Sequence, residues 1–235
     1  MHYKFLKTNL ATRNNASIFL HIKMTLQVRD LHQRYGDLEI LNIASWEIGE
    51  GIFWIQGENG AGKSTLFRTI AGMLPYTGSL LLDGRYDLKK HPVDFRLRLN
   101  LGEAEPLYPS FLTPIDLINF VAEAKKSPAG QIETLIEALG INYLETPFGS
   151  CSSGMVKKVS LAVAFLGTPS VIILDEPLIT IDREARTALF ALVRQYRSNG
   201  TTFLLSSHEA FRDGGLDLTE TFVLKNKMLS TVQAL

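Results

Sequence analysis

The chain has 235 residues, of which 46% are apolar, so it can bury the core of one large domain or two small ones. Lysine plus arginine and aspartate plus glutamate both number 24, which excludes a strong net field and argues against nucleic acid as a partner. The single cysteine, Cys151, excludes an internal disulfide and favours a reducing, cytoplasmic compartment. No apolar run approaches the ~18 residues that a membrane-spanning helix needs, so we expect a chain that does not span a membrane.

The first 23 residues differ in composition from the rest. They carry Lys4, Lys7, Arg13 and Lys23 with no acidic residue, and their apolar cluster is too short for the core of a signal peptide. We interpret residues 1–23 as a loosely attached extension, with a targeting role as the alternative. The folded domain is then expected over residues 24–235.

The next residues predict an antiparallel β unit followed by a strand and a helix. Apolar residues alternate after Thr25, a turn interrupts them, and the alternation resumes at 40–48. An apolar strand at 52–56 runs through a glycine-rich loop into a helix at 64–73, and a short strand is indicated at 79–83.

The middle of the chain changes to helical patterns, which dominate from about residue 113 and are clearest at 115–124 and 132–139. The remaining pattern alternates strand and helix, with an apolar strand at 171–174, an amphipathic helix at 183–197 and an apolar strand at 202–205. This order predicts an α/β fold, with an antiparallel β subdomain before the core and a helical subdomain inserted at about 106–166.

The glycine-rich loop has the residues and the position of a P-loop. We therefore predict that the α/β core is that of a P-loop NTPase. Its residues are Gly57, Glu58, Asn59, Gly60, Ala61, Gly62, Lys63, Ser64 and Thr65. Glycine lets the backbone curl until its NH groups point at phosphate oxygens, and Lys63 is expected to reach the β and γ phosphates of ATP. The Ser64 hydroxyl would bind Mg²⁺, and the positive end of the following helix would face the triphosphate. The plain alternative is a glycine turn with a surface lysine.

Two adjacent carboxylates, Asp175 and Glu176, follow the apolar strand at 171–174. A P-loop protein needs carboxylates to hold Mg²⁺ and to polarise water. We predict Asp175 as a metal residue and Glu176 as the general base for the attacking water. Without a P-loop in the chain, the same pair would be an ordinary acidic turn.

Together these motifs resemble the ATP-binding cassette (ABC) ATPases, whose further motifs follow in the expected order over nearly all of residues 25–235. Ser150 to Met155 is similar to the family's signature loop, usually Leu-Ser-Gly-Gly-Gln. The resemblance implies that Ser152, Ser153 and Gly154, at a helix start, bind the γ phosphate of ATP held by an opposite subunit. Ser153 and Met155 depart from the usual glycine and glutamine, in a form similar to cassettes that serve export-type permeases. The alternative is a plain serine helix cap.

The resemblance assigns roles to four more residues. Glu103 stands where the family places a glutamine that senses Mg²⁺, water and the permease; an exposed acidic loop is the alternative. His208 matches the catalytic switch histidine. Asp182 matches the loop that crosses the dimer interface, and it also suits a helix N-cap. Tyr35 matches the aromatic residue that stacks on adenine, although a tyrosine there also fits a core or rim position.

The resemblance therefore implies an ATPase that converts ATP and water to ADP and phosphate and uses ATP and Mg²⁺. It would close as a homodimer or heterodimer of ABC ATPase subunits around two ATPs. It would power a separate integral membrane permease from the inner face of the membrane, docked near Glu103 and the helical insertion, with export favoured. A soluble ABC ATPase that acts as a switch or assembly scaffold is the alternative.

Overall fold

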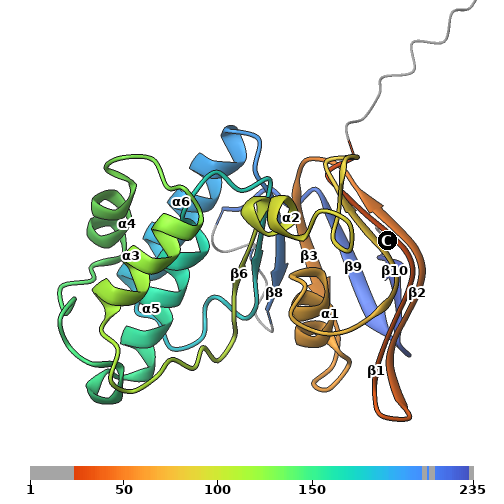
Figure 1. Ribbon diagram of the computed structural model, residues 1–235, viewed down its shortest axis with the longest axis horizontal. Coiled ribbons are helices and arrows are strands. Elements are labelled where there is room, and N and C mark those ends of the chain that lie inside the picture. The colour runs from red at the N-terminus through yellow and green to blue at the C-terminus, as the bar shows by residue number, and fades with distance from the viewer. Residues whose placement is uncertain (1–23, 208–210, 212–214, 233–235) are drawn as a thin grey trace, which may run out of the picture.

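The computed structural model describes residues 24–207, 211 and 215–232. The extension expected at residues 1–23 and the predicted switch histidine, His208, lie outside the described residues. Two sheets and a group of helices make up the fold, with the helices α3 to α6 gathered on the side away from the antiparallel sheet (Figure 1).

The first sheet is four-stranded in the order β2-β1-β4-β5, and its pairings are antiparallel. Its strands are β1 (Leu26–Tyr35), β2 (Leu38–Ile48), β4 (Thr77–Leu82) and β5 (Tyr86–Asp87). The expected alternation is present, since Leu26, Val28 and Leu31 are buried while the residues between them are more exposed. The turn is tighter than expected, because β2 already begins at Leu38.

The second sheet is six-stranded in the order β10-β9-β3-β8-β7-β6, and it is parallel except for the pairing of β9 with β10. Its strands are β3 (Ile52–Gln56), β6 (Leu99–Gly102), β7 (Val171–Leu174), β8 (Thr202–Ser206), β9 (Glu220–Lys225) and β10 (Met228–Thr231). All four residues of β7 are buried, as expected for a parallel strand that is covered on both faces.

Local signals set the helix ends. The helices are α1 (Lys63–Ile70), α2 (Pro92–Arg98), α3 (Pro114–Ala124), α4 (Gln131–Leu139), α5 (Ser153–Ala164) and α6 (Arg183–Ser198), with a 3₁₀ turn at Phe148–Ser150. Thr113 and Asp116 form a capping box on α3, and Asp182 caps α6. α1 ends at Ile70, before the predicted end at residue 73.

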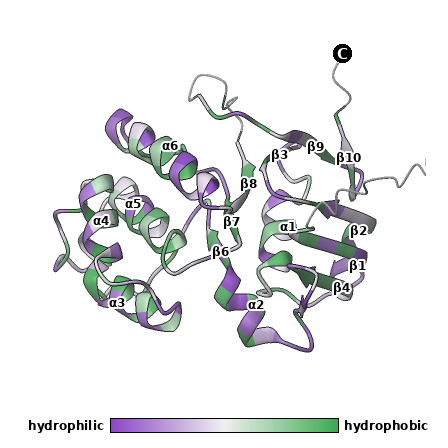
Figure 2. Ribbon diagram, turned by 90° about the horizontal axis from the view of Figure 1, so that it is seen from above, coloured by the Kyte–Doolittle hydropathy of each residue, from purple (hydrophilic) through white to green (hydrophobic). Residues whose placement is uncertain are grey.

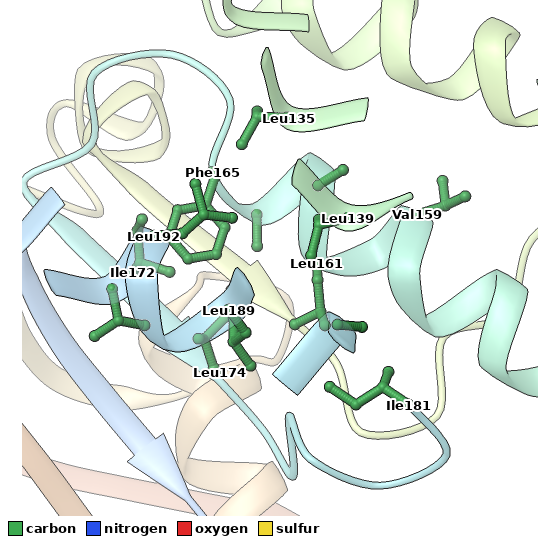
Figure 3. Packing of buried hydrophobic residues seen from close by; sticks show 14 of the residues in the cluster. Leu135, Leu139, Val159, Leu161, Phe165, Ile172, Leu174, Ile181, Leu189 and Leu192 are labelled. Carbon is green, nitrogen blue, oxygen red and sulfur yellow. The ribbon is translucent and has the colours of Figure 1, made fainter. Parts of the chain in front are cut away.

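The parallel sheet separates two hydrophobic clusters. Ile172 and Leu174 face a cluster built with α3 to α6, where side chains from α4, α5, α6 and β7 meet (Figure 3). Val171 and Ile173 face the other cluster, which contains α1 and the inner face of the antiparallel sheet. Figure 2 shows hydrophobic and hydrophilic residues alternating along α6, as expected for a helix that covers a sheet on one side. The predicted α/β fold class is confirmed.

Leu189 on α6 is 1% exposed inside the helical cluster, whereas Leu38 on β2 is 64% exposed. We expect Leu189→Ala to lower the free energy of unfolding by ~2–5 kcal/mol, because it leaves a cavity that its neighbours fill only in part. Leu38→Ala serves as the control and should change it by less than about 0.5 kcal/mol. Urea unfolding of both variants measures the difference, and equal losses would contradict the packing described.

Candidate active site

Three neighbouring parallel strands bring the predicted site residues to one edge of the sheet. β3 pairs with β8 and β8 pairs with β7, so their carboxyl ends lie side by side. A cavity of about 290 Å³ lies at this edge. It is lined by Ile40, Glu58, Asn59, Gly60, Ala61, Gly62, Lys63, Ser64, Thr65, Asp175 and Glu176. The glycine-rich loop and the acidic pair, far apart in the sequence, therefore share one cavity. Gly57 lines an adjoining cavity beside β9.

The loop is shaped as a cradle in front of α1. Gly62, the N-cap of α1, has φ 103°, and a Cβ there would lie 3.1 Å from the Ile40 side chain. Glycine suits both the positive φ and the close approach of Ile40, because it has no Cβ. Lys63 is buried, and its Nζ donates to the carbonyl oxygens of Gly57 at 2.7 Å and Glu58 at 3.3 Å. A lysine ammonium group and free backbone NH groups at the same helix N-terminus form an arrangement that binds phosphate.

The acidic pair is held by a hydroxyl group that sequence reasoning missed. Ser206 Oγ donates to Asp175 Oδ1 at 2.5 Å and accepts from the backbone NH of Glu176 at 3.0 Å. Glu176 has φ 44°, in the left-handed region, where strained residues at functional sites are concentrated. Both carboxylates are buried. The available signal for Ser206 was a hydroxyl group at the end of the strand next to β7.

Lys157 on α5 is a second missed residue. It is 1% exposed, and its Nζ donates to the backbone oxygens of Glu103, Ala104 and Asp175 at 2.6, 3.1 and 3.0 Å. Burial lowers the pKa of Lys157 to about 8, while nearby carboxylates, Asp175 and Glu176 first, act to raise it.

Glu103 lies outside the lining of the 290 Å³ cavity. Its Oε1 accepts from Nε of Arg68 on α1 at 2.8 Å, in an ion pair that is partly exposed to solvent. The predicted metal-sensing residue is therefore tied to the helix that follows the P-loop. Arg68 is a third residue that sequence reasoning did not single out.

The signature segment forms the start of α5. Ser152 is the N-cap, its Oγ accepts from the backbone NH of Met155 at 3.2 Å, and the Met155 sulfur lies 3.4 Å from the Ser152 nitrogen. A Cβ on Gly154 would lie 2.7 Å from the Thr180 carbonyl oxygen, so the loop before α6 requires glycine there. Ser152, Ser153 and Gly154 do not line the cavity beside the P-loop of their own chain.

Asp182 is the expected N-cap of α6, and it also forms an ion pair with α5. Its Oδ1 accepts from the backbone NH of Ala185 at 2.8 Å as the N-cap of α6, and its Oδ2 pairs with Lys158 of α5 at 2.5 Å. The hydrogen bond from Lys158, followed by the one from Ala185, lowers the pKa of Asp182. The N-cap of α6 is thus joined to the middle of α5. Tyr35, at the end of β1, is half exposed and does not line the 290 Å³ cavity.

Comparison with known proteins identifies the family. The family model described as "ABC transporter" matches residues 41–179. The chain belongs to the ABC transporter family. A lantibiotic transport ATP-binding protein, SrtF of Streptococcus pyogenes, is 29% identical over 186 residues, covering 78% of this chain and 80% of SrtF.

Solved structures agree with the ABC fold. "Structure of ATP binding subunit of ABC transporter" superposes with a TM-score of 0.78 at 25% identity, covering 88% of this chain and 90% of that chain. A dimeric ATP-binding cassette, MJ0796 bound to ADP and Pi, gives 0.74 at 15% identity, covering 89% and 100%. The predicted membership of the ABC ATPases and the transport-ATPase interpretation are confirmed at the level of the family. Within the described part of the chain, no helix is both long and apolar enough to cross a bilayer.

Ser206 offers a test of how the acidic pair is held. We expect Ser206→Ala to lower the free energy of unfolding by ~1–3 kcal/mol, because the buried Asp175 carboxylate and the Glu176 NH lose their shared partner. Ser198→Ala is the control, since Ser198 is exposed at the end of α6 and donates to the Gln195 carbonyl oxygen of its own helix. Guanidinium unfolding of the two variants measures both changes; a loss no larger than that of the control would refute the arrangement.

Proposed function

We propose that this chain is the Mg²⁺-dependent ATPase subunit of an ABC transporter, hydrolysing ATP to ADP and phosphate. The observation that carries the proposal is the single cavity shared by the P-loop, residues 57–65, and the acidic pair. Lys63 and the NH groups before α1 would bind the phosphates, and Tyr35 would stack on adenine.

The residues at the cavity fit Mg²⁺. This ion prefers oxygen ligands and is usually held by one or two carboxylates together with substrate phosphates. Ser64 and Asp175 both line the cavity, and the described residues hold no cluster of three metal-ligating side chains that would suit a metal bound by protein alone. Ser64 and Asp175 would hold the ion, and Glu103 would join them only after its ion pair with Arg68 opens. When bound, Mg²⁺ neutralises charge on the phosphate oxygens.

Glu176 is the group proposed to activate water. Its carboxylate would accept a proton while the water oxygen forms a bond to the γ phosphorus and the bond from that phosphorus to the ADP oxygen breaks. His208 would contact the γ phosphate and orient Glu176. The Ser206 hydroxyl supports this role indirectly, because it fixes the NH of Glu176 while bonding Asp175.

The site is proposed to be completed by a second subunit, either another copy or a related cassette. Ser152, Ser153 and Gly154 carry an anion-binding helix start, yet they do not line the cavity of their own chain. The MJ0796 cassette is a dimer in its solved structure. Asp182 would lie near that interface, where its ion pair with Lys158 joins the start of α6 to the middle of α5.

The permease is proposed to bind near Glu103 and the helical insertion, through the apolar side chains of Leu107, Phe111 and Phe120, which are 91%, 77% and 71% exposed. The backbone on either side of Phe111 is held by hydrogen bonds from Phe148 and Gly149 to the oxygens of Leu112 and Ser110. Exposed apolar side chains are a common feature of docking surfaces. The chain would then lie on the cytoplasmic face of the membrane, and the Ser-Ser-Gly-Met signature supports export.

Replacing the proposed base tests the catalytic assignment. We expect Glu176→Gln to lower ATP turnover by ~10²–10⁴-fold, because an amide cannot accept the proton of the attacking water. An ATP-bound dimer should accumulate, as measured by gel filtration with multi-angle light scattering. Glu133→Gln, on the exposed face of α4, is the control and should leave turnover unchanged. Retained turnover in Glu176→Gln without a trapped dimer would disprove the assignment.

The docking surface is tested by introducing a negative charge into it. We expect Phe111→Glu to weaken binding to the permease by at least about 2 kcal/mol, because it places a charge in an apolar contact. The measurement is the recovery of a polytopic membrane protein, identified by mass spectrometry, with the tagged chain from detergent-solubilised membranes. Val93→Glu is the control, since Val93 is also 71% exposed but belongs to α2, outside the helical insertion. Equal recovery with both variants would count against the surface.

A further inference from the structure

One buried ammonium group joins three segments that carry the proposed site. Lys157 belongs to α5, which begins at the signature, and its three N–H groups match three acceptors. Two are the carbonyl oxygens of Glu103 and Ala104, and the third is that of Asp175.

The contact with Asp175 matters most, because it restrains the peptide group between Asp175 and Glu176. The carbonyl oxygen of Asp175 and the NH of Glu176 belong to the same peptide group. Lys157 Nζ donates to the oxygen at 3.0 Å, and Ser206 Oγ accepts from the NH at 3.0 Å. Both polar atoms of this peptide are therefore bonded, and its rotation would require both bonds to break. This restraint maintains Glu176 at φ 44°, a conformation that a non-glycine residue adopts only when its surroundings impose it.

The segment of Glu103 is held in the same way. Lys157 fixes two successive carbonyl groups there, and the oxygen of Gly102, just before them, accepts from the NH of Asp175 at 2.8 Å. A buried ammonium is costly unless all its donors are bonded, so its position is closely defined by these carbonyls.

We propose that Lys157 is a positioning residue, which sets the Asp175–Glu176 peptide and the Glu103 segment relative to the start of α5. The signature and the acidic pair then move as one body. The signature would contact the partner's nucleotide, and the acidic pair would act on the nucleotide of its own chain. The inference rests on the proposed ATPase function, although its structural part concerns the nucleotide-free chain.

The chain offers a matched control in Lys125. Burial also lowers the pKa of this lysine to about 8, and its Nζ donates to the backbone oxygens of Arg96 and Leu99. It ties the end of α3 to α2 and β6, and its hydrogen bonds with described residues reach neither the acids nor the signature. Lys125→Met and Lys157→Met thus each remove an ammonium group that donates to backbone carbonyl oxygens, one away from the acidic pair and one beside it.

The experiment compares Lys157→Met, Lys157→Gln and Lys125→Met in the full chain. In the nucleotide-free protein, we expect amide hydrogen exchange at Asp175 and Glu176 to become at least about tenfold faster in Lys157→Met, because the peptide loses one of its two restraints. In ATPase assays below the melting temperature, kcat should fall by ~10–100-fold while KM for ATP changes less than about threefold. Lys157→Gln retains two donors and should recover part of both properties. Lys125→Met should lose stability without either change.

Unchanged exchange at 175–176, or a kcat within about twofold of the parent, would overturn the inference. So would an equal loss of kcat in Lys125→Met. If Lys157→Met does not fold, Lys157→Gln replaces it, and a folded Lys157→Gln with no change in either measurement also overturns it. A parent chain without ATPase activity would refute the proposed function, whereas the exchange comparison would still decide the role of Lys157.

Discussion

The parallel pairing of β3 with β8 and of β8 with β7 is the constraint on which the site depends. The register places Ile55 beside Ser206 and Leu174 beside Leu205, so the P-loop, the Ser206 hydroxyl and the acidic pair emerge at one level of the sheet. Both faces of these strands are buried, and a slip by one residue would exchange the residues that face each cluster. The hydrophobic packing thereby fixes the positions of charged groups that contribute nothing to it.

The two faces of that sheet supply different parts of the site. α1, with Lys63 at its start and Arg68 in its last turn, belongs to the cluster shared with the antiparallel sheet. α5, with the signature and Lys157, belongs to the helical cluster. The Glu103 segment connects them, since its side chain pairs with Arg68 while its carbonyl group accepts from Lys157. A displacement of α1 or of α5 would therefore strain or break a bond to the Glu103 segment.

Sequence reasoning was most successful where the signal is contiguous. The P-loop, the strand before Asp175 and the helix caps at Ser152 and Asp182 depend on neighbouring residues, and each stands in the local structure predicted. The strands β6, β9 and β10 were missed because none of them is a continuous apolar run like Val171–Leu174. The helix α2 was missed because its seven residues make only about two turns. Ser206, Lys157 and Arg68 act on residues distant in the sequence, and only the tertiary pairing of strands and helices brings those groups into contact.

The departures from the usual ABC motifs have local physical counterparts. Met155 still faces the N-cap nitrogen of Ser152, with sulfur as a weak acceptor in place of an amide, so the cap geometry is retained. Ser153 occupies the first helical position, which tolerates most side chains. Glu103 adds a carboxylate at the position of the usual glutamine, and its side chain pairs with Arg68 of α1 and does not line the 290 Å³ cavity. Arg68 pairs directly with Glu103, and the carboxylates of Asp175, Glu176 and Glu103 all act to raise the pKa of Lys157 against the effect of its burial. The substituted position is therefore linked to both lysine-bearing α5 and arginine-bearing α1.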